Sequence, residues 1–327
     1  MFKLLKRLAA TAVLGLLAVS AAAEEAQIRL ATAFPENTSW VQELVKWSER
    51  VNSKGKGLVK INFIGGPRAI PTFEIGNAVK SGVVDMALSP GAFYTNVFPE
   101  ADMLKMAQIP VSEQRKNGAI EYINKVWNEK GNMVYLARMV EGYPFHIYLT
   151  QKIDKLDLTG KKIRVSPAIR PAVQALNGNV INIPPGEIYT ALERSVIDGY
   201  GWSIGGIFDL KIAPLTKFRV DPGFYDADVS LIMNLDKWKS MTPQQRDFIQ
   251  KMAMEIESNS SYWHKEGEDE KKKQNASGIQ PLTFGAAETA KYLDAVYEAG
   301  WSDLIKTSPI HGPKLRALLS KEAMRKQ

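Results

Sequence analysis

In this chain of 327 residues, the side chain best suited to bind a charged ligand is Arg164, which lies in a short basic segment. The segment runs from residue 161 to 165, and strand alternation would send Ile163 and Val165 to one face and Lys162 and Arg164 to the other. A guanidinium can pair two parallel hydrogen bonds with a carboxylate, and a short strand that ends in a loop can aim it into a cleft. On composition alone, an arginine such as Arg164 is more often an ordinary exposed charge than a binding group.

A second segment, Gly201-Trp202-Ser203-Ile204-Gly205, fits the G-x-S-x-G pattern of serine hydrolases, and His264 and His311 follow in the chain order of that fold. The pattern also needs a buried apolar strand before the serine. Residues 197–201 are short, polar and interrupted by glycine. We therefore predict that the protein is not an enzyme, with a secreted serine hydrolase that uses Ser203 as the alternative.

The sequence predicts neither a metal nor a cofactor. Its three histidines, His146, His264 and His311, are far apart, and none has a carboxylate partner at helical ligand spacing. The chain has no cysteine, which excludes disulfides and thiolate chemistry. His146 stands in an apolar run between Phe145 and Ile147, which is typical of a histidine in a core or a pocket wall.

The first residues predict export. Lys3, Lys6 and Arg7 precede an apolar run over residues 8–19 and a small-residue segment that ends at Ala23, as in a secretory signal peptide. The run is shorter than the roughly 20 apolar residues of a transmembrane helix. Cleavage after Ala23 would remove three positive charges and no negative ones, and would lower the net charge from +7 to +4. That modest excess does not suggest a nucleic-acid partner.

Short strand-like runs alternate with helical runs, which predicts an α/β fold with largely parallel sheets. About 300 residues after the leader are expected to form two domains. The expected strands are residues 28–31, 60–64, 83–88, 133–138, 145–150, 162–165 and 179–183.

Three helices are also expected. The first begins at Thr38 or Ser39 and buries one stripe, formed by Trp40, Leu44, Trp47 and Val51. A second follows residues 184–186. The longest runs from Thr242, with Pro243 at its first position, to about Lys273, and is long enough to brace two domains.

Several segments, in chain order, resemble the solute-binding proteins of TRAP (tripartite ATP-independent periplasmic) transporters, of the DctP type. The specific ones are the Leu-x-Gly-x-Lys-Ile-Arg-Val run at residues 158–165 and the run from Glu-x-Tyr-x-Ala-Leu to Asp-Gly at residues 187–199. Residues 28–32, 78–86 and 98–101 support the match. The resemblance implies a type II-like periplasmic binding protein with a hinge and a long domain-bridging helix. It also implies that Arg164 pairs with the ligand carboxylate.

The resemblance further implies a periplasmic location, a small organic acid as ligand and the integral membrane subunits of a TRAP permease as partners. We expect lobe I to comprise residues 24–141 and about 230–270. Lobe II is expected to comprise residues 142–229 and about 271–327.

Two departures from the family pattern narrow the ligand. Sialic-acid binders of the family carry a second arginine and an asparagine at positions that read Pro144 and Trp202 here. Members that bind 2-oxo acids or lactate have a tryptophan like Trp202, preceded by an acidic residue that helps to hold a metal ion. Gly201 stands at that position, so we expect no bridging cation.

We therefore predict a binding protein for a small monocarboxylate, whether apolar, aromatic or a 2-oxo acid. The pocket is expected to be rich in aromatic surface. The predicted ligand-binding residues are Arg164, Trp202, Tyr200, Phe34, Tyr94, Phe145, His146 and Tyr225.

Overall fold

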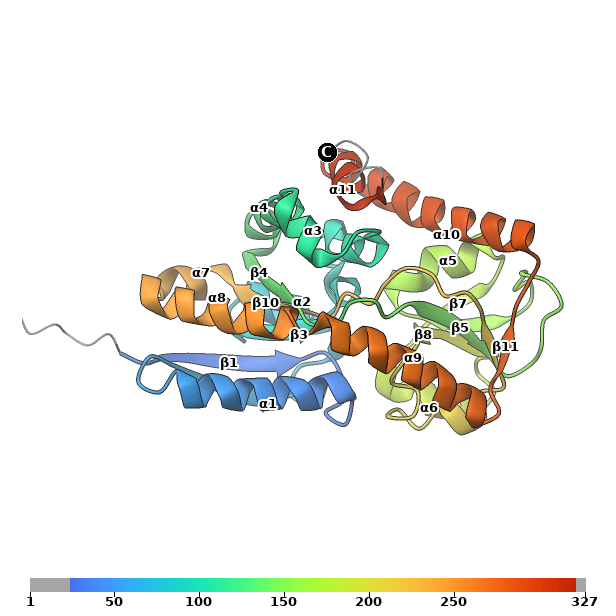
Figure 1. Ribbon diagram of the computed structural model, residues 1–327, viewed down its shortest axis with the longest axis horizontal. Coiled ribbons are helices and arrows are strands. Elements are labelled where there is room, and N and C mark those ends of the chain that lie inside the picture. Colours follow the sequence, from blue (N-terminus) through green and yellow to red (C-terminus); the bar gives the residue numbers. More distant parts are fainter. Residues whose placement is uncertain (1–23, 322–327) are drawn as a thin grey trace, which may run out of the picture.

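Two separate β-sheets divide the protein into two lobes that lie side by side (Figure 1). The computed structural model describes residues 24–321, without the side chains of Ser260 and Ser261, so the predicted signal peptide lies outside the described residues. Helices flank both sheets, which confirms the predicted two-lobed α/β fold.

Each lobe is built on one mixed sheet. Lobe I has the strand order β2-β1-β3-β10-β4, and lobe II has the order β11-β9-β5-β8-β6-β7. The strands of lobe I are β1 (Ala26–Thr32), β2 (Val59–Gly65), β3 (Met86–Ser89), β4 (Met133–Arg138) and β10 (Ser230–Asn234). Those of lobe II are β5 (Phe145–Leu149), β6 (Lys162–Val165), β7 (Asn179–Asn182), β8 (Gly199–Ser203), β9 (Phe218–Val220) and β11 (Gln280–Leu282).

The expectation of largely parallel sheets holds except for one strand in each lobe. β10 runs antiparallel to β3 and β4, and β5 runs antiparallel to β8 and β9. Both strands directly follow a crossing between the lobes, at residues 221–229 and 139–144. β5 and β10 each begin at the edge of the sheet that faces the other lobe, whereas their neighbouring strands end at that edge. This explains why β5 and β10 run antiparallel to their neighbours.

The first predicted helix is α1 (Ser39–Lys54), and its predicted stripe is buried as expected. Thr38 holds the N-cap position, as predicted, but its side chain makes no capping hydrogen bond. The Thr38 hydroxyl donates to the carbonyl oxygen of Pro35, and the backbone N–H of Ser39 donates to Oδ2 of Asp209, 2.9 Å away, on the segment that follows β8. The sequence could not show this cap because Asp209 lies 170 residues away and in the other lobe.

The predicted helix at residues 242–273 consists of two helices, so the expectation of one continuous helix was wrong. α8 (Pro243–Glu257) begins with a capping box between Thr242 and Gln245, and α9 (Ser260–Ala276) follows a break at Ser258 and Asn259. The Ser258 hydroxyl donates to the carbonyl oxygen of Glu255, 2.9 Å away. Such side chains compete with the helical hydrogen bonds, which accounts for the break.

The two helices still bridge the lobes. α8 packs against α1 and β4 in lobe I. The amide of Gln274, near the end of α9, donates to the hydroxyl of Tyr148 in lobe II, 3.2 Å away. Figure 1 shows the pair running across the molecule from one lobe to the other.

The remaining helices cover the sheets and their edges. In lobe I these are η1 (Thr72–Glu74), α2 (Ile75–Lys80), η2 (Gly91–Tyr94), η3 (Pro99–Met106), α3 (Val111–Lys116), α4 (Ala119–Gly131) and α7 (Leu235–Ser240). In lobe II they are η4 (Pro167–Ile169), α5 (Arg170–Ala175), η5 (Pro185–Glu187), α6 (Ile188–Glu193) and η6 (Ala213–Leu215).

The C-terminal helices join the lobes a second time. α10 (Ala286–Thr307) packs against α5 in lobe II and η3 in lobe I, and α11 (Gly312–Leu319) packs against η3 and α4 in lobe I. These residues were expected in lobe II, but they contact both lobes. No helix within residues 24–321 combines the length and the apolar character needed to cross a bilayer.

Candidate functional site

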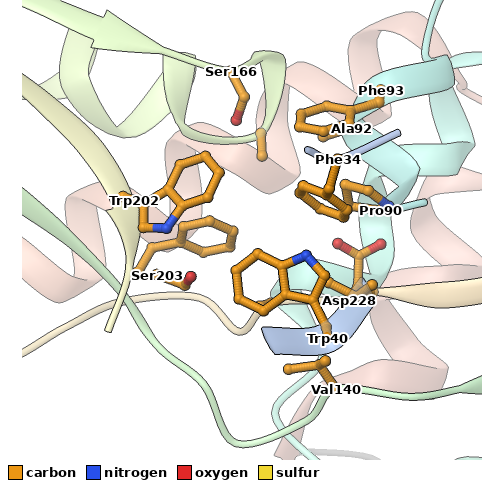
Figure 2. A pocket seen from close by; sticks show the side chains of 14 residues that line it. Phe34, Trp40, Pro90, Ala92, Phe93, Val140, Ser166, Trp202, Ser203 and Asp228 are labelled. Atoms are coloured by element: carbon orange, nitrogen blue, oxygen red, sulfur yellow. The ribbon is translucent and has the colours of Figure 1, made fainter. Parts of the chain in front are cut away.

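A cavity lies between the lobes, where the crossing segments pass (Figure 2). Its volume is ≈ 30 Å³, room for about two water molecules, so the lobes are close together around it. Most of the lining side chains are apolar. The lining residues are Phe34, Trp40, Pro90, Ala92, Phe93, Val140, Phe145, Ser166, Ala168, Trp202, Ser203, Ala227, Asp228 and Val229.

Lobe I contributes an aromatic wall. Phe34 follows β1, Trp40 stands in the first turn of α1, and Phe93 lies in η2. The ring centroid of Phe34 lies 5.1 Å from that of Trp40 and 5.4 Å from that of Phe93. The indole Nε1 of Trp40 is buried and has no hydrogen-bond partner among the described residues. The wall is therefore apolar apart from one free donor.

Lobe II contributes the facing wall. Trp202 on β8 and Phe145 on β5 come from neighbouring strands, and Ser166 follows β6. The indole of Trp202 lies 6.3 Å from that of Trp40, so the two rings meet across the interface between the lobes (Figure 2). Nε1 of Trp202 donates to the carbonyl oxygen of Gly205, 3.0 Å away, which holds the ring in place.

Arg164 is a fully buried cation without a counter-ion. Its side chain is 0 % exposed, and it forms no ion pair with any residue between 24 and 321. Nε donates to the carbonyl oxygen of Ile183 at 2.8 Å and Nη1 to that of Gly201 at 3.2 Å, while Nη2 has no partner. Burial lowers the pKa of Arg164 to about 9.

The guanidinium lies next to the cavity but does not line it. Its central carbon is 5.4 Å from the ring centroid of Trp202, the geometry of a cation–π contact. The ring of Trp202 lines the cavity, whereas Arg164 is not among the lining residues. The guanidinium of Arg164 and the cavity thus adjoin the same ring, that of Trp202.

Asp228 lies on the crossing segment that leads from lobe II to β10. Its carboxylate is buried, and Oδ2 accepts a hydrogen bond from the backbone N–H of Gly91 at 2.9 Å. Oδ1 has no partner among the described residues. Burial raises the pKa of Asp228 to about 7, against the opposing effects of the Arg138 charge and the Gly91 hydrogen bond.

Of the eight predicted ligand-binding residues, Phe34, Phe145 and Trp202 line this cavity. Tyr200 shares a strand with Trp202, but its ring stacks on Tyr148 with centroids 5.0 Å apart, and its hydroxyl lies 2.7 Å from Oγ1 of Thr216. Tyr200 therefore does not line the cavity.

Tyr94 and Tyr225 are also placed elsewhere. The hydroxyl of Tyr94 accepts a hydrogen bond from Nε1 of Trp127 at 3.2 Å, inside lobe I. The hydroxyl of Tyr225 donates to the carbonyl oxygen of Val296 on α10, 2.6 Å away. Both hydroxyls have protein partners, and neither residue lines the cavity.

His146 belongs to a separate buried cluster. Its Nδ1 lies 2.9 Å from the carbonyl oxygen of Val220 and 3.0 Å from Oδ1 of Asp221. Arg219 donates to both carboxylate oxygens of Asp221 at 2.9 Å and to Oε1 of Gln274 at 2.9 Å. The cluster joins β5, β9 and α9, and it satisfies its own charges.

The serine-hydrolase pattern does not form a nucleophile elbow. β8 ends at Ser203, but turns rather than a helix follow it. The Ser203 hydroxyl donates to the carbonyl oxygen of Gly205 at 3.1 Å. His264 packs close to Gly142, and Nδ1 of His311 lies 2.9 Å from the hydroxyl of Tyr122. Neither histidine is hydrogen-bonded to Ser203. Within residues 24–321, no group of three or more His, Asp or Glu side chains is arranged to hold a metal ion.

Sequence reasoning missed Trp40, Phe93 and Asp228 as cavity residues. Trp40 was assigned to the buried stripe of the first helix, and it is both buried and part of the wall. Asp228 stands just before the apolar run of β10, on a predicted crossing between lobes. An acidic residue at that place in the sequence was the available signal.

Comparisons with known proteins agree with this architecture. Residues 30–302 match the family model described as bacterial extracellular solute-binding protein, family 7. The monocarboxylate 2-oxoacid-binding periplasmic protein of Nostoc sp. is 22 % identical over 238 residues, which cover 69 % of this chain and 65 % of that protein.

Two solved structures share the fold. A TRAP periplasmic solute-binding protein from Desulfovibrio salexigens, with bound orotic acid, has a TM-score of 0.81 and 17 % identity over 92 % of this chain and 99 % of that one. The Bordetella pertussis extracytoplasmic solute receptor DctP7, which binds pyroglutamic acid, has a TM-score of 0.79 and 16 % identity over 90 % and 99 % of the chains. Because the family model spans most of the sequence, this chain belongs to family 7 of the bacterial extracellular solute-binding proteins, as the resemblance to TRAP solute-binding proteins predicted.

Proposed function

We propose that this protein captures a small organic monocarboxylate between its lobes and delivers it to the integral membrane permease of a TRAP transporter. The observation that carries the proposal is Arg164, which is fully buried, cationic and without a counter-ion among the described residues. A buried ion without a partner costs several kcal/mol. A ligand carboxylate would supply the missing partner and remove that cost.

The rest of the site supports one carboxylate and an apolar body. Phe34, Trp40, Phe93 and Trp202 give the cavity aromatic walls. The one ionisable side chain among its lining residues is Asp228, whose acidic group would repel a second carboxylate. The apolar, aromatic or 2-oxo monocarboxylates predicted from the sequence match these walls. The named ligands of the Nostoc and Bordetella relatives, 2-oxo acids and pyroglutamic acid, are small carboxylates as well.

The indole of Trp202 lines the cavity and lies under the guanidinium, so a carboxylate that pairs with Arg164 must bind beside this ring or displace it. The small cavity volume also requires the walls to move before a ligand of several heavy atoms enters. Binding is therefore coupled to opening and closing of the lobes. The closed lobes exclude water and strengthen the ion pair.

Export fits this role. The leader at residues 1–23 has the charged, apolar and small-residue order of a signal peptide, and the family is one of extracellular solute-binding proteins. We propose that the mature protein begins after Ala23 and works in the periplasm, where the permease subunits are its partners.

A thermal-shift screen of small acids tests the proposal. The panel contains monocarboxylates from acetate to aromatic acids, matched dicarboxylates and the neutral amides of the best hits. A ligand at 100 times its dissociation constant adds about 2.7 kcal/mol to the free energy of unfolding. We expect stabilisation by monocarboxylates that disappears in Arg164→Ala. The proposal would be contradicted if the neutral amides stabilised the protein as much as the acids do, or if no acid stabilised it.

A further inference from the structure

The cavity contains an unpaired acceptor that the carboxylate contact does not use. Asp228 is 1 % exposed, and its Oδ1 has no hydrogen-bond partner among the described residues. Its other oxygen, Oδ2, accepts a hydrogen bond from the backbone N–H of Gly91, and this bond alone is enough for Asp228 to hold η2 in place. Leaving a buried acceptor unpaired is costly. The fold therefore gives no reason for the second oxygen.

The surroundings leave that oxygen free to meet a ligand. Figure 2 shows the carboxylate of Asp228 directed into the cavity, beside Trp40 and Phe34. Neither nearby cation donates to it: Arg138 donates to the carboxylate of Asp226, and Lys105 donates to that of Asp102. The charged groups that act on Asp228 are Arg138 on β4 and Asp102 and Lys105 on η3. Two tyrosines also face it, because, besides burial, the charge of Asp228 raises the pKa of Tyr94 on η2 and of Tyr135 on β4.

Two unpaired groups of opposite character thus lie at the ligand site. Arg164, beside Trp202, offers a cationic donor from lobe II, and Asp228 offers an acceptor from the crossing segment. A ligand that satisfies both must carry a carboxylate and, at another position, a hydrogen-bond donor. Nε1 of Trp40, also unpaired, can donate to an acceptor oxygen on the same ligand.

Building on the proposed carboxylate function, we propose that Asp228 accepts a hydrogen bond from an N–H or O–H group of the ligand. The protein then selects amino, lactam or hydroxy acids over acids of the same shape that lack the donor. An analogue without the donor leaves Oδ1 buried and unpaired. Sites built to hydrogen-bond a ligand group reject such analogues strongly.

Titration calorimetry with matched pairs of acids tests this selection. One pair is pyroglutamate and its lactone isostere 5-oxotetrahydrofuran-2-carboxylate, in which a ring oxygen replaces the N–H. The other is 2-hydroxyisobutyrate and pivalate, in which a methyl group replaces the hydroxyl. For the pair that fits the site, we expect the donor-bearing acid to bind at least about tenfold more tightly, given the cost of an unpaired buried group.

Asp228→Asn should reduce that ratio to about threefold or less, because an amide whose oxygen accepts from Gly91 turns its NH2 to the ligand, and an NH2 cannot accept the hydrogen bond of the ligand donor. Its oxygen still accepts from Gly91, so the fold is retained. If the variant does not fold, the wild-type protein at two pH values replaces it. The ratio should rise between pH 5.5 and 8, since an accepted donor favours the ionised carboxylate.

The outcomes separate this inference from the proposed function. If acids bind through Arg164 but both members of each pair bind alike, the role of Asp228 is wrong and the carboxylate function stands. A ratio that persists in Asp228→Asn, or equal weakening of both members, also overturns the role. If no acid binds the wild-type protein, the proposed function and this inference both fail. Arg164→Ala, which should lose both members of each pair, is the control.

Discussion

Two arginines in the sheet of lobe II are equally buried but differently partnered. Arg219 on β9 and Arg164 on β6 are both 0 % exposed. Arg219 donates to both oxygens of Asp221 and to the amide oxygen of Gln274, each at 2.9 Å. Arg164 donates to two backbone carbonyl oxygens and leaves Nη2 without a partner among the described residues.

The difference separates a structural cation from the cation that we propose pairs with the ligand. Asp221 neutralises Arg219, and Gln274 ties that pair to α9, so this charge belongs to the fold. Arg164 carries its desolvation cost without an acidic partner, and it lies over a ring that lines the cavity. A charge that the fold buries and does not neutralise marks the place where a ligand of opposite charge would stabilise the protein.

The largest expected effect comes from removing each arginine in turn. Arg164→Ala should weaken monocarboxylate binding by about 2 to 5 kcal/mol, the cost of truncating one partner of a buried charge pair. It should leave the stability of the ligand-free protein unchanged or raise it. Arg219→Ala should lower the free energy of unfolding by about 3 to 5 kcal/mol, because it leaves the buried carboxylate of Asp221 without its arginine, with only His146 beside it. Its folded fraction should bind normally. Calorimetry and urea unfolding measure the two effects.

Arg164→Lys is the matched control. An ammonium has the same charge but cannot reproduce the planar fork, so we expect little recovery of affinity. Near-normal binding in either Arg164 variant would remove the distinction between the two arginines.

The dependence of stability on pH should differ in sign between two buried aspartates. Burial raises the pKa of Asp221, but hydrogen bonds from His146 and Arg219 outweigh it, and the pKa lies well below the usual range. Stability from Asp221 is therefore present above about pH 4 and is lost as the pH falls below that value. Asp228, whose pKa is about 7, keeps a proton that the unfolded chain releases, so its contribution falls as the pH rises from about 4 to 7.

Urea unfolding of Asp221→Asn and Asp228→Asn between pH 4.5 and 8 checks these signs. Asp221→Asn should be less stable than the wild-type protein throughout this range. Asp228→Asn should gain stability over the wild-type protein as the pH rises, at about 1.4 kcal/mol per unit of pKa difference, and by no more than a few kcal/mol. Parallel curves for Asp228→Asn and the wild-type protein would contradict the ionisation of Asp228 near neutral pH.

A third buried cation extends the comparison to closure of the lobes. Lys105 of η3 donates to Asp102 in its own lobe and to the carbonyl oxygen of Ala168 in lobe II. A hydrogen bond from a charged group contributes about 1.5 to 3 kcal/mol. Lys105→Met should therefore weaken ligand binding by up to that amount, mainly through faster release. Stopped-flow kinetics measures the release rate.

Small-angle scattering supplies the structural readout for the same contact. The radius of gyration should decrease when the wild-type protein is saturated with ligand, and Lys105→Met should reduce the fraction that closes. An unchanged profile at saturation would show that the lobes do not close on the ligand.

The comparison also shows how far the sequence alone could lead. Strands such as β4 and β6 were predicted at their observed bounds, because their patterns are local. The family motif singled out Arg164, which lies over a ring that lines the cavity; that it binds a ligand stays a prediction. The absence of a counter-ion at Arg164 could not be predicted, because it depends on which side chains the fold brings around that residue. For Arg219 the acidic partner Asp221 stands only two residues along the chain, but Gln274 reaches it through a tertiary contact.

The aromatic residues show the same limit. Tyr200 and Trp202 are two residues apart on β8, so strand periodicity places them on the same face, yet one ring lines the cavity and the other stacks inside the lobe on Tyr148. Strand periodicity gives the face of a side chain but not its neighbours. Asp228 was missed because it lies on a crossing segment, where no periodicity applies.

The smallest expected effect concerns Trp202. Its indole is the neighbour of the Arg164 guanidinium, whereas the neighbour of the Arg219 guanidinium is the carboxylate of Asp221. Trp202→Ala should weaken bulky or aromatic monocarboxylates more than acetate-sized ones. A buried aromatic contact contributes about 0.5 to 1.5 kcal/mol beyond its area burial, and a short acid has little surface to lose. The variant also uncovers Arg164, so part of its effect would fall on every ligand alike. The difference between a short and a bulky acid, measured by calorimetry in both proteins, isolates the selective part. Equal losses would mean that Trp202 supports the arginine and the strand without selecting the ligand.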